Sequence, residues 1–181
     1  MIHRIRRIFR PFRKDERGLA SIEFALFFPL YVGLFFWAVE LGIITIKSVM
    51  LDHAMDVSMR ELRLGLVNDP TSDKLKDAIC DRARIIGECD EQLMIEMRPI
   101  STQTWAIPAT PIACRNNDVP DMQPVVTFDP GRQQELVLVR ACIMIPVLMP
   151  NTMFGRQLIE AADGTGRIGI STISSFVNEP T

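Results

Sequence analysis

The longest apolar stretch of the chain is residues 24–46, FALFFPLYVGLFFWAVELGIITI, which contains a single charged residue, Glu40. Lys47 closes it on the C-terminal side. A helix of about 20 apolar residues is long enough to cross the hydrocarbon core of a bilayer. A soluble helix of this length normally keeps a polar face, so a buried core helix explains the pattern less well. We therefore predict a transmembrane helix at residues 19–46 and an exported domain at residues 47–181.

Beyond the span, apolar residues recur at intervals of three or four, while Asp52, Asp56 and Arg60 fall on another face. This period predicts that the helix continues out of the membrane as an amphipathic helix. Gly65 and the following 68–70 segment, Asn-Asp-Pro, are expected to end it. The expected buried stripe is Leu51, Met55, Met59, Leu62 and Leu66.

A second helix is predicted over residues 72–86, with Thr71 or Ser72 as its N-cap and Gly87 as its stop. Its expected buried stripe is Leu75, Ile79, Ala83 and Ile86.

The period then changes to that of strands. Alternation at 93–98 predicts one strand, and the apolar run 135–147, broken only by Arg140, predicts a central strand. A third, weaker strand is expected at 168–177. Helices followed by strands favour an α+β domain with an antiparallel sheet of about three to four strands. The remaining expectations are an irregular, proline-rich connection over 99–134 with a short strand near 125–128, and a short helix over 152–162 capped by Asn151.

Charge is distributed unevenly along the chain. Residues 1–18 hold seven Lys and Arg against two acidic residues, and the remainder holds 13 basic against 20 acidic residues. A basic cluster beside a span stays cytoplasmic, which places the C-terminal part outside the inner membrane. Because the cluster directly precedes the span, we expect no nucleic-acid partner. A cleaved secretory signal fits less well, since the apolar run is longer than 7–15 residues and no A-x-A-like site ends it.

Four cysteines, all in the predicted exported part, indicate two disulfides in an oxidising compartment. Four cysteines allow three pairings, and the sequence does not choose among them. We favour Cys80 with Cys89 and Cys114 with Cys142. A zinc site is disfavoured because there is no C-x-x-C pair and His53 is the only histidine in this part. We expect no metal and no cofactor.

The residues before the span form the motif Arg17-Gly18-Leu19-Ala20-Ser21-Ile22-Glu23-Phe24. A glycine ends the charged leader, and a glutamate and an aromatic residue follow five and six positions later. This motif resembles the processing site of type IV pilin-like proteins. The resemblance implies cleavage by prepilin peptidase between Gly18 and Leu19. It also implies that Glu23, beside Phe24, pairs with the new amino group of a neighbouring subunit and sets subunit register. Taken alone, Glu23 is equally explained as a headgroup-level carboxylate at a helix N-terminus.

The span itself, EFALFFPLYVGLFFWAVELG, resembles the start of TadE/TadG-like minor pilins of the tight-adherence (Flp) pilus system. The matching features are Glu23-Phe24-Ala25-Leu26, Pro29, Glu40-Leu41-Gly42 and a terminal Phe176-Val177-Asn178-Glu179-Pro180. Leu41 departs from the family, which more often has an aromatic residue there. The resemblance implies a minor pilin or pseudopilin that is not an enzyme. Its partners would be prepilin peptidase, other pilins, pilus-assembly proteins of the inner membrane and the lipid bilayer.

Two residues inside the span have open roles. Pro29 is expected to kink the helix, or is a membrane proline without a role. Glu40 either extends toward the membrane surface or pairs with a partner helix, and we favour the partner helix.

Other signals are set aside. Gly164 to Gly169 fits G-x-G-x-x-G but lacks the strand, helix and distal acid of a nucleotide site, so we expect a turn. Asp52, His53 and Asp56 are expected to be solvated positions rather than metal ligands. Two alternatives to the pilin interpretation stay open: an uncleaved single-pass scaffold protein, and a secreted soluble domain behind an atypical signal peptide.

Overall fold

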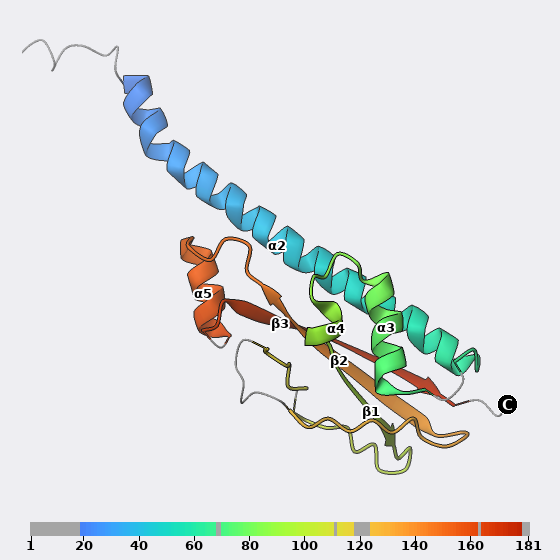
Figure 1. Ribbon diagram of the computed structural model, residues 1–181. Helices are drawn as coiled ribbons and strands as arrows, with labels where there is room; N and C mark the ends of the chain where they lie inside the picture. Colours follow the sequence, from blue (N-terminus) through green and yellow to red (C-terminus); the bar gives the residue numbers. More distant parts are fainter. Residues whose placement is uncertain (1–18, 68–69, 111, 118–123, 163, 179–181) are drawn as a thin grey trace, which may run out of the picture. The chain divides into compact units, whose positions relative to one another are not determined.

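The computed structural model describes residues 19–67, 70–110, 112–117, 124–162 and 164–178 (Figure 1). A long N-terminal apolar helix is followed by a small domain with further helices and a three-stranded antiparallel sheet, so the predicted α+β architecture is confirmed at this level. The chain forms two compact units, Met1–Val39 and Glu40–Thr181. The elements are α2 (Leu19–Arg63), α3 (Ser72–Arg82), α4 (Cys89–Gln92), β1 (Met94–Ile100), β2 (Leu136–Pro146), α5 (Met153–Ala161) and β3 (Arg167–Val177).

Helix α2 ends in a glycine-based cap. Gly65 has a φ of 67°, which glycine adopts without strain. The amide of Gly65 donates to the carbonyl of Leu62 (3.0 Å), and the amide of Leu66 donates to that of Glu61 (3.1 Å). This turn carries Leu66 out of the helical stripe. The prediction for Leu66 is therefore wrong: it is 69% exposed, whereas the other four members of the stripe are buried.

The sheet has the order β1-β2-β3, with both pairs antiparallel. In its register Glu96 of β1 lies opposite Arg140 of β2, and Arg140 lies opposite Ile173 of β3. Strand β2 is the central strand, as predicted, and nearly all of its side chains are buried on both faces. An apolar run with little alternation is typical of a strand covered on both sides.

One face of the sheet holds the core. Alternate residues of β2, including Val137, Val139 and Ile143, are fully buried and form one cluster with the apolar faces of α2 and α3. The stripe predicted for the second helix, Leu75, Ile79, Ala83 and Ile86, is buried, although its last two members follow the end of α3.

Two helix boundaries differ from the predictions, and one short helix was not predicted; the N-cap of α3 is one of the two residues predicted for it. Helix α3 ends at Arg82 rather than at residue 86, and the chain turns before the unpredicted helix α4. Thr71 is the N-cap of α3, with its hydroxyl accepting from the Lys74 amide at 3.4 Å. Thr152, not Asn151, caps α5, because the Thr152 hydroxyl accepts from the Gly155 amide at 3.0 Å.

The described residues of the connection between β1 and β2, 101–110, 112–117 and 124–135, are largely irregular, as predicted. Strand β1 runs to Ile100 and includes Pro99, which an edge strand tolerates. In place of the predicted strand near 125–128 there is one parallel bridge between Met97 and Phe128.

Candidate functional site

The predicted processing and register residues lie at the start of α2. Gly18 lies outside the described residues, and Leu19 is the first residue of the helix. Phe24 is 64% exposed and stacks on Phe28, with ring centroids 4.9 Å apart. Pro29 lies within the continuous helix. The helix is long and apolar enough to cross a membrane, and none of its most apolar window is buried.

Glu23 is exposed on this apolar helix. Within the described part of the chain, no hydrogen bond or ion pair to its carboxylate is observed. A carboxylate in an apolar membrane segment is costly unless it is paired. The geometry therefore leaves Glu23 open to a group from outside the described chain.

Glu40 has the opposite environment. It is 3% exposed, and its two carboxylate oxygens accept hydrogen bonds from consecutive backbone amides. Oε1 accepts from Leu148 at 2.8 Å and Oε2 accepts from Met149 at 3.0 Å, although both donors lie more than 100 residues away in sequence. Charge-assisted bonds of this kind are stronger than neutral ones. The carboxylate thus fixes the start of the second unit to the loop between β2 and α5, and the predicted pairing with a partner helix stays a prediction.

The loop that binds Glu40 is itself held in place. The Val147 amide donates to the Gly166 carbonyl at 3.1 Å, and the Thr152 hydroxyl donates to the Met149 carbonyl at 2.8 Å. A Cβ at Gly155 would collide with the Met149 carbonyl oxygen, so only glycine fits there. Gly155 was not recognised from the sequence; its position after a threonine cap is the one local signal of this tight turn.

Both disulfides form, with the favoured pairing: Cys80–Cys89 and Cys114–Cys142. The first joins α3 to α4 across the turn between them, over a sequence separation of nine. The second ties the irregular connection to β2, over a sequence separation of 28. Such bonds stabilise mainly by restricting the unfolded chain, and they persist in oxidising compartments.

A buried ion pair lies on the face of the sheet opposite the core. The Arg140 Nε donates to Glu96 Oε2 at 2.8 Å, and the Arg140 Nη1 donates to the Thr110 carbonyl at 2.6 Å. Both residues are buried, with Glu96 8% exposed and Arg140 7% exposed as whole residues. The sequence showed only that Arg140 interrupts an apolar run; its partner depends on strand register. Because the arginine also reaches the connection, the pair fastens that connection to the sheet.

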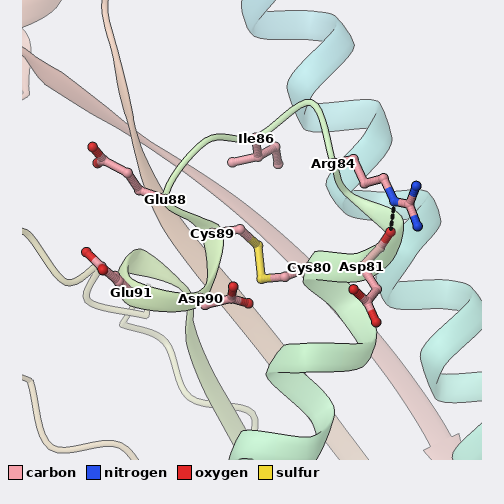
Figure 2. A pocket seen from close by; sticks show the side chains of 8 residues that line it. All are labelled: Cys80, Asp81, Arg84, Ile86, Glu88, Cys89, Asp90 and Glu91. Carbon is pink, nitrogen blue, oxygen red and sulfur yellow. Dashed lines mark hydrogen bonds between the residues drawn. A yellow bond between two sulfur atoms is a disulfide. The ribbon is translucent and has the colours of Figure 1, made fainter.

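A hollow of about 370 Å³ adjoins the first disulfide (Figure 2). Four of its eight lining residues are acidic, and the Arg84 Nε donates to the Asp81 carbonyl (3.0 Å). The cysteines in it are oxidised to a disulfide and offer no thiolate. The acidic lining residues are Asp81, Glu88, Asp90 and Glu91.

The structure places the residues of the two sequence signals that we set aside, the glycine motif and the Asp52, His53 and Asp56 group. Gly164 and Gly166 have φ values of 77° and 86° in the turn before β3. Asp52, His53 and Asp56 are exposed on α2, and Asp56 accepts a hydrogen bond from the Ser174 hydroxyl at 3.4 Å. Across the described ranges, no group of three or more His, Cys, Asp or Glu residues is placed to hold a metal ion.

No protein-family model, no curated protein and no solved structure matches this chain.

Proposed function

We propose that this chain is a minor pilin or pseudopilin of the TadE/TadG-like type, anchored in the inner membrane by the first part of α2. In this proposal it contributes to assembly of a Flp-type pilus or a related secretion apparatus. Its action is by contact between helices and between domains rather than by catalysis.

The observation that carries the proposal is the contrast between two glutamates of one apolar helix. Glu40 is satisfied by two backbone amides of its own chain. Glu23 is exposed and has no observed partner in the described part of the chain. Since an intramembrane carboxylate is costly without a partner, Glu23 favours a group supplied by another subunit. The amino group that cleavage before Leu19 creates on a neighbouring subunit would have the required charge.

Two further features support an exported, anchored domain. The segment 19–39 contains 21 residues, which as a helix measure about 31 Å and match the roughly 30 Å hydrocarbon core. The two disulfides suit the oxidising side of the membrane.

The first test is the intact mass of the protein extracted from membranes of its native host. We expect a mature chain that begins at Leu19 and gains the mass of four hydrogens on reduction of its two disulfides. An intact Met1 would favour the uncleaved scaffold, and a soluble chain beginning beyond residue 40 would favour the secreted domain.

The second test is pilus assembly in cells that carry Glu23→Ala, with Glu23→Asp as the conservative variant. We expect Glu23→Ala to abolish assembly while the protein level and both disulfides stay unchanged, and Glu23→Asp to retain part of the activity. Leu34→Ala is the matched control, because it trims an exposed side chain of the same helix and leaves the carboxylate in place. Normal assembly by the Glu23→Ala variant would refute the assigned role of Glu23.

A further inference from the structure

The loop that binds Glu40 also presents an apolar surface. Between residues 141 and 155 the chain has no charged side chain. Leu148 is 55% exposed and Met153 is 73% exposed, and two prolines beside them are exposed as well. We call this surface the 146–153 patch; it consists of Pro146, Leu148, Pro150 and Met153.

The hydrogen bonds to Glu40 fix where this patch lies along the helix. The backbone amide of Leu148 is 2.8 Å from the Glu40 carboxylate, so the loop lies at the level of Glu40. The next charged residue of the helix is Lys47, seven residues later, or about 10 Å along the helix axis. Leu41 and Ile46, between them, are about half exposed and apolar. The apolar surface of the helix therefore continues past Glu40 and ends before Lys47. The loop lies beside the beginning of this last apolar stretch.

We infer that the 146–153 patch inserts into the outer leaflet of the membrane, at the level of the headgroups and the first acyl carbons. This inference rests on the membrane anchoring in the proposed function. Apolar side chains of interfacial segments are buried about 5–10 Å into this zone. Glu40 fits this arrangement, because its carboxylate accepts from the Leu148 and Met149 amides, which would lose their water partners where the loop reaches the acyl carbons.

The charge around the patch fits an interfacial position. Arg156, the first charged residue after the patch, is exposed in the first turns of α5. A cation at the edge of an apolar surface suits the phosphate level of a bilayer. Lys47 on α2 has the corresponding place at the end of the apolar run.

The test is quenching of tryptophan fluorescence by lipid-borne bromine in the full-length protein. The chain is reconstituted into vesicles of phosphatidylglycerol and phosphatidylcholine, with the phosphatidylcholine brominated close to its headgroup. The native tryptophans are replaced in the variants Trp37→Phe and Trp105→Phe. Leu148→Trp is the reporter, and Met153→Trp is a second reporter in case the first disturbs the loop. Intact mass under non-reducing conditions checks that both disulfides form.

Trp105, retained in a Trp37→Phe chain, is the matched control. It is 60% exposed, like the reporter positions. It follows β1, whose last residue, Ile100, pairs with Leu136 at the opposite end of β2 from Pro146. Ten residues of strand separate those ends, about 33 Å.

We expect bromine to reduce the fluorescence of both reporters to about half or less, and to leave Trp105 unchanged. Unquenched reporters together with a quenched Trp37, retained in a Trp105→Phe chain, would overturn lipid insertion of the patch and leave the anchored helix intact. An unquenched Trp37 would overturn the anchoring and this inference together. Reporters that lose exposure to aqueous acrylamide only at high protein density would assign the patch to a second copy and also overturn lipid insertion.

Discussion

The two parts of helix α2 have different surroundings, although the helix is continuous. Residues 20–38 are almost entirely exposed, including side chains as large as Phe24 and Tyr31. From Glu40 onward one face is buried, with Leu51 and Met55 at 1% exposure or less. An exposed apolar surface this large is not stable in water. The surface of the first part therefore needs lipid or another protein around it, whereas the second part buries its apolar face in the core of the domain.

The polar residues of the two parts follow the same division. In the second part, Asp56 and Glu61 lie on the side facing water or pair with the domain, and Glu61 binds Arg82 at 2.6 Å. In the first part the one charged residue among the described positions is Glu23, which has no observed partner among the described residues. Glu40 lies where the exposed part of the helix ends and the part with a buried face begins. The difference teaches that one continuous helix can hold an exposed apolar segment and a segment with one buried face, with a buried carboxylate at the start of the second.

The largest expected effect comes from placing charge in the first part. Leu30 and Leu34 are both more than half exposed, and each change of leucine to lysine within a span costs about 3 kcal/mol of insertion free energy. We expect the double variant Leu30→Lys with Leu34→Lys to move the protein from the carbonate-resistant membrane fraction to the soluble or aggregated fraction. Ile173→Lys, at an exposed position of β3, should stay in the membrane fraction. If the double variant also remains there, residues 19–39 are not the anchor.

A smaller effect is expected from removing apolar volume on the buried face. Leu51→Ala should lower the free energy of unfolding of the domain by about 3 kcal/mol, because the leucine is 1% exposed in the core. The matched change Leu34→Ala should alter it by less than about 0.5 kcal/mol, since no domain contact is removed. Denaturant titration of the full chain in detergent, followed by circular dichroism, measures both. Equal losses for the two variants would contradict the division of the helix.

The smallest effect is expected at the junction. Glu40→Ala leaves the amides of Leu148 and Met149 without acceptors, so we expect a loss of about 2 kcal/mol and a melting temperature lower by about 4–8 °C. Glu40→Gln keeps one acceptor oxygen and should lose less. Hydrogen exchange at these two amides gives the local measurement. Unchanged protection in Glu40→Ala would show that the carboxylate does not hold the loop.

The elements that depend on local periodicity were determined by the sequence. Three patterns are of this kind: the apolar run over 24–46, the stripe from Leu51 to Leu62 and the apolar run of β2. In each of them many residues follow the same period, so a single exception does not change the prediction. The even number of cysteines predicted two disulfides, but the sequence left three pairings open, and the tertiary structure decides that Cys80 bonds to Cys89 and Cys114 to Cys142.

The tertiary structure alone decided the partners of single polar groups. Glu40 binds amides 108 and 109 positions away, and Arg140 binds Glu96 only because the strand register places them opposite each other. No local pattern encodes such distant pairs. The ends of helices were also hard to predict. The positive φ of Gly65 turns the chain and takes Leu66 away from the buried face of α2, and the positive φ of Glu88 precedes the unpredicted helix α4. Periodicity selects the elements, and long-range contacts between individual groups decide how their ends are joined.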